Sequence, residues 1–179
     1  MKHTAPHPSN ARRRAALAAP LALLAGAVLP RSFVGAAEVG QSAPPLQLPG
    51  TAGPVDLKAW QGQVVFVDFW ASWCGPCKLS FPWMDAMQLR HGGRGLRVLA
   101  VNLDRQRADA DAFLARLQPR FAVAFDAGGD TARRYDVKAM PTSVLVGADG
   151  QVVRHHAGFK DDDKAPLEAA IVAALGRAK

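Results

Sequence analysis

Cys74 and Cys77 are the only two cysteines in the chain, and Gly75 and Pro76 separate them. A pair at this spacing can bind a metal, close a structural disulfide or exchange electrons with another thiol pair. Structural zinc needs four ligands, and the histidines beyond residue 37 do not stand at zinc-finger spacing. A disulfide across so short a loop constrains little of the unfolded chain. The pair therefore favours redox exchange.

The cysteine pair is expected where a buried strand turns into a helix. Gly75 lets the chain turn closely, and Pro76 suits the first helical turn, where its missing N–H is not needed. The N–H groups and dipole of that helix favour a thiolate at Cys74. Position 71 is alanine, whereas a peroxide-reducing cysteine usually follows a Thr or Ser three residues earlier.

Strands and helices alternate in the rest of the pattern, which predicts an α/β domain with a mixed sheet. Apolar and β-branched runs predict strands over 63–70, 96–103, 121–125, 142–146 and 151–156. Helices are expected over 74–90, 106–118 and 130–135, and from the acidic run 161–163 to residue 175. Asp104 is expected to cap the second helix. The Pro- and Gly-rich residues 38–60 indicate short strands or a hairpin.

Residues 1–36 have the pattern of an export signal. Three arginines at 12–14 precede an apolar stretch over 15–29, and small residues offer cleavage after Ala36 or Ala37. We therefore expect a signal peptide over 1–36 and one domain over 37–179, soluble and periplasmic after export. An uncleaved N-terminal membrane anchor is the alternative.

The net charge of +7 does not indicate nucleic-acid binding. Five of the 22 basic residues lie in the first 36 positions, which hold no acidic residue. The remainder carries 17 basic and 15 acidic side chains, a net charge of +2, and its basic residues are scattered. The dense basic surface that nucleic acids require is therefore not expected.

The segment VDFWASWCGPCK at 67–78, together with Pro82, resembles the active-site segment of thioredoxins. KAMPT at 138–142 resembles their second signature, the loop before a cis-proline. The export signal, the Pro-rich entry and the segment between Leu103 and Phe125 resemble the TlpA-like branch of periplasmic thiol-disulfide oxidoreductases. The resemblance implies a thioredoxin fold: a mixed central sheet flanked by helices, with an N-terminal β extension and an insert between Leu103 and Phe125.

The resemblance also implies roles for the residues that carry it. Cys74 matches the attacking thiolate and Cys77 the resolving thiol. Asp68 matches the buried aspartate that accepts a proton from the resolving cysteine, with a solvated edge residue as the alternative. The lysine that accompanies this aspartate in many thioredoxins is missing, because Ala100 stands there. A glutamate found in many TlpA-like proteins is replaced by Ser80.

Substrate binding is implied for the residues around the cysteines. Pro141 should have a cis peptide bond, and the backbone of Met140 should pair with an extended substrate segment. Trp73, Gly75 and Pro76 complete the expected contact surface. Trp73 should cover the site, with a plain core aromatic as the alternative.

The Gly-Pro dipeptide resembles the reducing, thioredoxin end of the scale of reduction potentials, about −270 mV, and favours a reductase of protein disulfides. Protein thiols and disulfides are the expected substrates. Apocytochrome c thiol sites, copper-site assembly proteins and a sulfenylated or misoxidised cysteine are the alternative targets, and the sequence does not choose among them. No nucleotide-binding motif is present, so we expect a membrane thiol-electron transporter to donate the electrons. We also expect no resident cofactor and a monomer. The alternatives are an oxidase or isomerase of the same fold, and a copper metallochaperone.

His155 and His156 are adjacent on a predicted strand. Neighbouring strand residues point to opposite faces, so the two rings make a poor metal chelate. Both are expected to be solvated strand residues, and no metal site is predicted.

Overall fold

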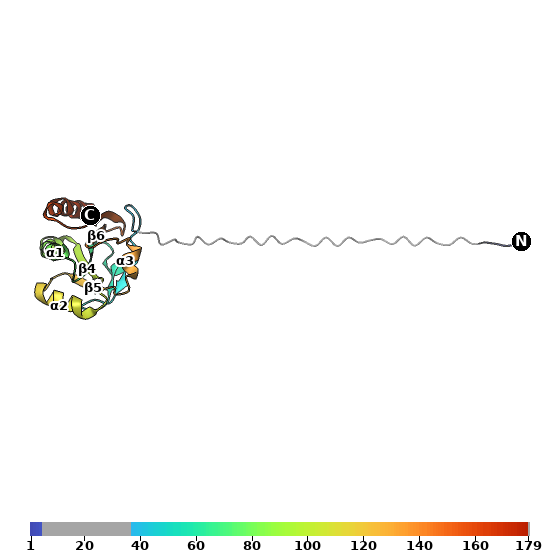
Figure 1. Ribbon diagram of the computed structural model, residues 1–179. Helices are drawn as coiled ribbons and strands as arrows, with labels where there is room; N and C mark the ends of the chain where they lie inside the picture. Colours follow the sequence, from blue (N-terminus) through green and yellow to red (C-terminus); the bar gives the residue numbers. More distant parts are fainter. Residues whose placement is uncertain (5–36, 179) are drawn as a thin grey trace. The chain divides into compact units, whose positions relative to one another are not determined.

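A computed structural model describes residues 1–4 and 37–178, and the latter form the folded unit (Figure 1). The expected export signal lies almost entirely outside the described residues. Five strands form the main sheet: β3 (Val64–Trp70), β4 (Leu96–Asn102), β5 (Ala122–Phe125), β6 (Thr142–Val146) and β7 (Val152–Ala157). Their order is β5-β4-β3-β6-β7. The β3–β4 and β4–β5 pairs are parallel and the other two antiparallel, so the predicted mixed sheet is confirmed.

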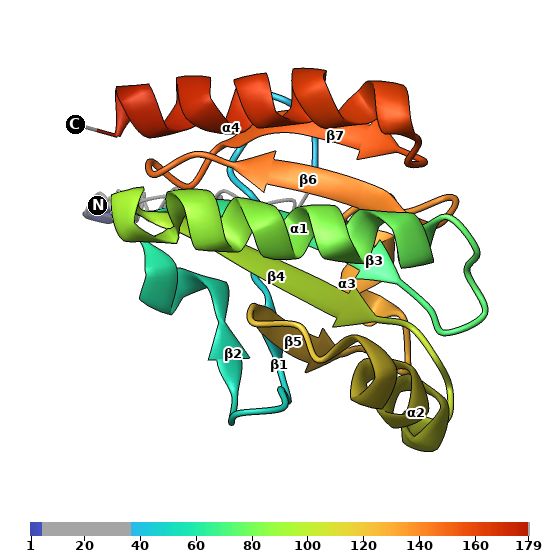
Figure 2. The ribbon, with the colours of Figure 1, turned by 90° about the vertical axis from the view of Figure 1, so that its left-hand side faces the viewer.

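Helices cover both faces of this sheet. The α-helices are α1 (Cys77–His91), α2 (Arg107–Leu117), α3 (Asp130–Arg134) and α4 (Lys164–Arg177). Short 3₁₀ helices are η1 (Leu57–Trp60), η2 (Gly92–Arg94) and η3 (Asp161–Asp163). Figure 2 shows α1 in front of β3 and β4, with α4 along the side of β6 and β7. Within the described residues, no helix is long and apolar enough to cross a membrane.

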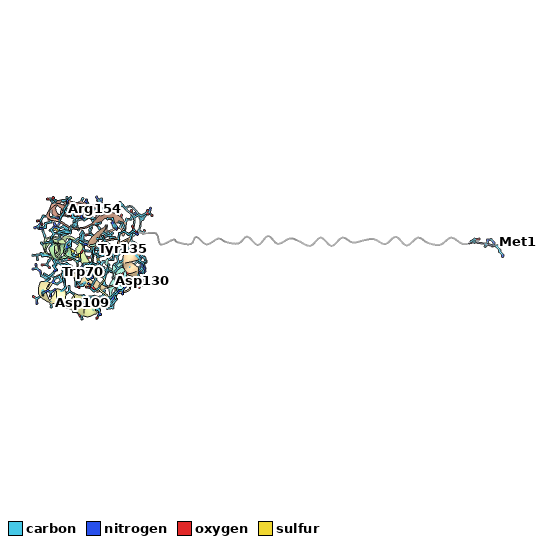
Figure 3. All side chains as sticks on the ribbon, viewed as in Figure 1. Met1, Trp70, Asp109, Asp130, Tyr135 and Arg154 are labelled. Carbon is cyan, nitrogen blue, oxygen red and sulfur yellow. A yellow bond between two sulfur atoms is a disulfide. The ribbon has the colours of Figure 1, made fainter. Side chains whose placement is uncertain are left out.

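β3 is the central strand, and all seven of its residues are buried. Successive side chains point to opposite faces, so a strand covered on both sides is expected to be mainly apolar, and Asp68 is its one charged residue. Phe66 and Trp70 face the core formed with α1 and α4, whereas Val67 and Phe69 face the core formed with Tyr135 and the N-terminal extension. Trp70 (labelled in Figure 3) joins an aromatic cluster with Phe81 and Phe113, at centroid distances of 4.8 and 4.7 Å.

The N-terminal extension, residues 37–60, contains the expected hairpin of β1 (Gln47–Leu48) and β2 (Val55–Asp56). It also contacts both edge strands. Ser42 bridges Gln151 just before β7, and Gly50 bridges Ala124 in β5. Gly50 needs to be glycine, because a Cβ there would lie 2.9 Å from the carbonyl oxygen of Val123.

Two local predictions need correction. The helix expected from Cys74 begins at Cys77, because residues 71–76 form turns that lead out of β3. Asp104 does not cap α2: the N-cap is Gln106, and its side chain makes no capping hydrogen bond. Asp104 lies too early in the chain to cap this helix and instead binds the loop that follows β3.

Candidate active site

Cys74 and Cys77 form a disulfide at the start of α1, with their Cα atoms 5.4 Å apart. α1 begins at Cys77, so Cys74 lies on the turn ahead of the helix. Cys77 is fully buried and Cys74 is nearly so. The backbone N–H of Cys77 donates to Cys74 Sγ at 3.3 Å. In the reduced protein, this N–H and the helix dipole favour negative charge on the Cys74 sulfur.

The loop before Cys74 is held by Asp104, which is only 5% exposed. Its carboxylate accepts hydrogen bonds from the backbone N–H and the hydroxyl of Ser72, at 2.9 and 3.1 Å. The side-chain amide of Asn102 donates to the same carboxylate at 2.8 Å. Sequence reasoning assigned this aspartate to the wrong partner. Asp104 lies two residues after β4, and neighbouring parallel strands end at the same edge of a sheet, so its nearness to the end of β3 could have been predicted.

Asp68 lies in the middle of β3 and is 1% exposed, so the solvated alternative is wrong. Its side chain points to the same face as Phe66 and Trp70, the face that α1 covers. The hydroxyl of Ser143 donates to Asp68 Oδ1 at 2.8 Å. Burial raises the pKa of Asp68 to about 7, and this hydrogen bond opposes the rise. A carboxyl group with this pKa can gain or lose a proton near neutral pH.

The loop ahead of β6, which contains Met140 and Pro141, lies at the same end of the sheet as the end of β3 and the start of α1 (Figure 2). β6 begins at Thr142, directly opposite Phe69 near the end of β3. The peptide bond between Met140 and Pro141 is cis, as the resemblance implied. Met140 packs against the core cluster that contains both cysteines. The structure therefore brings the two thioredoxin-like signatures together.

The surface around the disulfide is exposed and partly apolar. Trp73 is 71% exposed, so the alternative of a core aromatic is wrong. Gly75 and Pro76 are also exposed. Near the start of α1, Leu79 is 56% exposed. The sequence analysis did not identify Leu79 as part of this surface, although its position two residues after Cys77 was a signal in the sequence.

The two adjacent histidines are less solvated than expected, and both are half-buried. His155 lies opposite Val144 and its Nε2 is 3.2 Å from the carbonyl oxygen of Tyr135. His156 lies opposite Ser143, on the face that α4 covers. As expected, the two rings point to opposite faces of β7, but neighbouring elements cover both faces.

Two further features lie outside this site. A hollow of about 290 Å³ is lined mainly by the extension and the β6–β7 turn, including Leu46, Trp60 and Val146. Val146 pairs with Val65, at the other end of β3 from Cys74, so this hollow is not part of the dithiol site. Among the described residues, no group of three or more His, Cys, Asp or Glu side chains is placed to hold a metal ion.

A five-strand sheet of this order, with a dithiol after its central strand, is the thioredoxin fold of thiol-disulfide oxidoreductases. The sequence profile of the Redoxin family matches residues 38–171. The chain is 31% identical over 122 residues to thiol-disulfide oxidoreductase ResA of Bacillus thuringiensis subsp. konkukian, covering 68% of this chain and 70% of that protein.

Solved structures agree. A Chlorobium tepidum protein assigned as thiol:disulfide interchange protein DsbE has 51% identity and a TM-score of 0.76, over 78% of this chain and 99% of that one. A Bacteroides thetaiotaomicron protein assigned as a protein disulfide isomerase has 24% identity and a TM-score of 0.71, over 78% and 91%, and shows the fold alone. The chain belongs to the Redoxin family of the thioredoxin superfamily, and it is a thiol-disulfide oxidoreductase.

Proposed function

We propose that this protein is a periplasmic reductase of protein disulfides. The observation that carries the proposal is the Cys74–Cys77 pair at the start of α1, with Gly-Pro between the cysteines. The backbone N–H that reaches Cys74 Sγ stabilises a thiolate, which is the attacking species in disulfide exchange. The export pattern over residues 1–36 supports the location.

The reduction proceeds in two exchanges. The Cys74 thiolate attacks one sulfur of a target disulfide, and the other target sulfur leaves as a thiolate. Cys77 then loses its thiol proton to the Asp68 carboxylate and attacks Cys74 Sγ. This step forms the Cys74–Cys77 disulfide and releases the second target thiolate. Two electrons pass to the target, and a membrane thiol-electron transporter returns them to the protein by the same exchange in reverse.

Asp68 is suited to accept the Cys77 proton. Its carboxyl group is buried on the sheet face covered by α1, whose first residue is Cys77. A pKa of about 7 leaves part of the carboxyl ionised at neutral pH and lets it hold the proton after transfer. Ser80, where many TlpA-like proteins have glutamate, instead donates its hydroxyl to the Cys77 carbonyl oxygen at 3.1 Å. Proton transfer therefore depends on Asp68.

The substrate binds across the exposed end of the site. Trp73, Gly75 and Pro76 form one wall around Cys74, and all three are exposed. The backbone of Met140, ahead of Pro141, pairs with an extended segment of the target beside its disulfide. This arrangement suits an unfolded or flexible protein segment that contains a disulfide.

The experiment that tests the proposal is a redox titration. The protein is equilibrated in glutathione or dithiothreitol buffers of known potential, and the state of Cys74 and Cys77 is read by alkylation and mass. A midpoint below about −230 mV is expected for a reductase. A midpoint above about −180 mV would overturn the proposal and make the protein a disulfide donor or isomerase.

A further inference from the structure

Asp68 lies between two very different neighbours in the sheet. In β4 it is directly opposite Ala100, which carries no polar group, and in β6 it is directly opposite Ser143. Figure 2 shows these two strands on either side of β3. Residues paired in this way point to the same face of a sheet, so all three side chains share the face that α1 covers. Of the two opposite residues, only Ser143 can donate a hydrogen bond to the carboxylate.

The hydroxyl of Ser143 does make this hydrogen bond. It donates to Asp68 Oδ1 at 2.8 Å, and the two residues are 2% and 1% exposed. β6 is paired with β3 on one side and with β7 on the other, which fixes the backbone of Ser143 between them. The hydroxyl therefore stays beside the carboxylate, in a place that is closed to water.

The two oxygens of the Asp68 carboxylate have different surroundings. Oδ1 receives the hydrogen of Ser143, whereas Oδ2 is buried and has no hydrogen-bond partner among the described residues. A buried acceptor without a donor is costly, and more so when it is charged. A proton bound at Oδ2 removes this cost. Oδ1 therefore anchors the carboxyl group, and Oδ2 is the oxygen left to take up a proton.

The helices that cover this face bring few other polar groups toward Asp68. The buried residues of α1 are apolar apart from Cys77, Ser80 and His91, and those of α4 are all apolar. Ser80 donates to the Cys77 carbonyl oxygen, and His91, at the far end of α1, is paired with Glu168. Cys77 is therefore the titratable group that α1 places over this part of the sheet.

The remaining charged side chains near this face lie on β7, η3 and α4: Arg154, His156, Asp161, Asp162, Asp163, Lys164 and Glu168. Lys164 is paired with Asp161, and the ring of His156 with Asp163. Within the described part of the chain, none of them forms a hydrogen bond or ion pair with Asp68, and the hydroxyl of Ser143 is its only polar contact.

The pKa of Asp68 reflects these surroundings. Burial raises it to about 7, and the hydrogen bond from Ser143 lowers it. A hydrogen bond to an ionised carboxylate is stronger than one to a neutral acid, so the hydroxyl stabilises the carboxylate more than the acid. Without the hydroxyl, burial acts unopposed and the carboxyl group keeps its proton at neutral pH. A protonated Asp68 cannot accept the proton of Cys77.

We propose that Ser143 is a positioning residue for the proton step: its hydroxyl keeps the Asp68 carboxylate ionised through Oδ1 and leaves Oδ2 to take the Cys77 proton. This inference rests on the proposed function, in which Cys77 attacks Cys74 Sγ. The S–H bond of Cys77 breaks and an O–H bond forms at Asp68 Oδ2. The electron pair left on the Cys77 sulfur forms the new S–S bond, and the target leaves as a thiolate. Ser143 keeps its own proton throughout.

The variants S143T and S143V test the proposal as a matched pair, because threonine and valine have the same shape and differ in the hydroxyl. The Asp68 carboxyl carbon is followed by NMR in the full-length reduced protein, from about pH 5 to about pH 10, and is assigned by its loss in D68N. S143V should titrate about one pH unit above wild type, a tenfold change in the ionisation equilibrium, whereas S143T should stay close to wild type. Equal midpoints in S143T and S143V would overturn the proposal. S143A carries the same expectation as S143V and replaces it if valine prevents folding.

Thr142 provides the control for loss of a buried hydroxyl from the same strand. It is 1% exposed, and its hydroxyl donates to the Ala139 carbonyl oxygen at 2.7 Å. It pairs with Phe69 and so points to the opposite face from Asp68. T142V should therefore leave the Asp68 midpoint in place. A midpoint that rises equally in T142V and S143V would reveal a general packing effect and would overturn the role of Ser143.

A kinetic readout separates this inference from the proposed function. Cys74 is loaded as a mixed disulfide with an aromatic thiol, and its release by Cys77 is followed by absorbance across pH. At about pH 7, release should be about fivefold slower in S143V than in S143T, because the ionised fraction of Asp68 falls from about one half to about one tenth. The difference should vanish near about pH 9, where Asp68 is ionised in both.

The outcomes of the kinetic experiment are distinct. Equal rates in S143T and S143V, with D68N slow, would refute the role of Ser143 alone. A D68N variant that releases the aromatic thiol as fast as wild type would refute the proton transfer to Asp68 in the proposed function instead.

Discussion

The carboxylate of Asp104 accepts two hydrogen bonds from Ser72, one from the backbone N–H and one from the hydroxyl. The contact joins the end of β4 to the loop that follows β3, two residues before Cys74. It holds the dithiol loop from a neighbouring strand, because Asp104 lies at the same sheet edge as the loop. Side chains outside the cysteine motif therefore fix the position of the first sulfur.

Removing the Asp104 carboxylate should destabilise the protein. D104A leaves the donors of Ser72 and Asn102 without their acceptor in a site that is nearly closed to water. We expect a loss of about 2 to 3 kcal/mol in the free energy of unfolding, measured with urea on the oxidised protein. D162A, at an exposed position in η3, is the control and should change it by less than about 0.5 kcal/mol. Equal effects of the two substitutions would contradict the assigned role.

The buried carboxyl of Asp68 should make stability depend on pH. Its pKa is raised from 3.8 to about 7 in the folded protein, so the folded state holds a proton that the unfolded state loses first. The free energy of unfolding that Asp68 contributes is therefore fully present below about pH 4 and is lost as the pH rises to about 7. D68N lacks this titration, so with rising pH its free energy of unfolding should increase relative to that of wild type, by an amount on the order of 4 kcal/mol.

Urea unfolding of wild type and D68N at several pH values provides the measurement. Other carboxyl groups cancel in the difference, including Asp85 and Glu168, whose pKa values Arg120 and Arg90 hold below the usual range. A difference between the two proteins that stays constant from about pH 4 to about pH 8 would show that Asp68 does not titrate in this window.

The two cysteines should behave differently when replaced. C77S leaves Cys74 able to attack a target but removes the group that releases it, so a mixed disulfide should accumulate. C74S should trap little, because its remaining sulfur is fully buried. Mass spectrometry of each reduced variant, mixed with a disulfide-containing protein, gives the trapped fraction. Equal trapping by both variants would argue against Cys74 as the attacking sulfur.

The aromatic cluster under the site should dominate the stability of this face. Phe113 on α2 is 2% exposed and packs against Trp70 and Phe81, with centroids 4.7 and 5.1 Å away. F113A should cost about 3 to 5 kcal/mol in the free energy of unfolding, through lost burial and the cavity left behind. L89A, which truncates a side chain that is 69% exposed, is the control and should cost less than about 1 kcal/mol.

The sequence was sufficient for features with a local signal. The apolar run of β3 and the Gly-Pro between the cysteines each depend on neighbouring residues, and strand, turn and helix were predicted in order. The role of Asp104 and the burial of His156 were missed because both depend on strand register. The sequence of a strand indicates that the side chains of His155 and His156 point to opposite faces, but it does not indicate that α4 covers the face of His156.

The extension that precedes β3 has a consequence for association with other chains. Gly40 donates to the Val152 carbonyl at one border of the sheet, and Phe125 donates to the Pro49 carbonyl at the other. The segment 40–49 therefore forms backbone hydrogen bonds at both edges of the sheet. Unpaired backbone groups at sheet edges promote strand exchange and fibre-like stacking between copies. At these positions the extension occupies backbone groups that would otherwise be open to pairing with another chain.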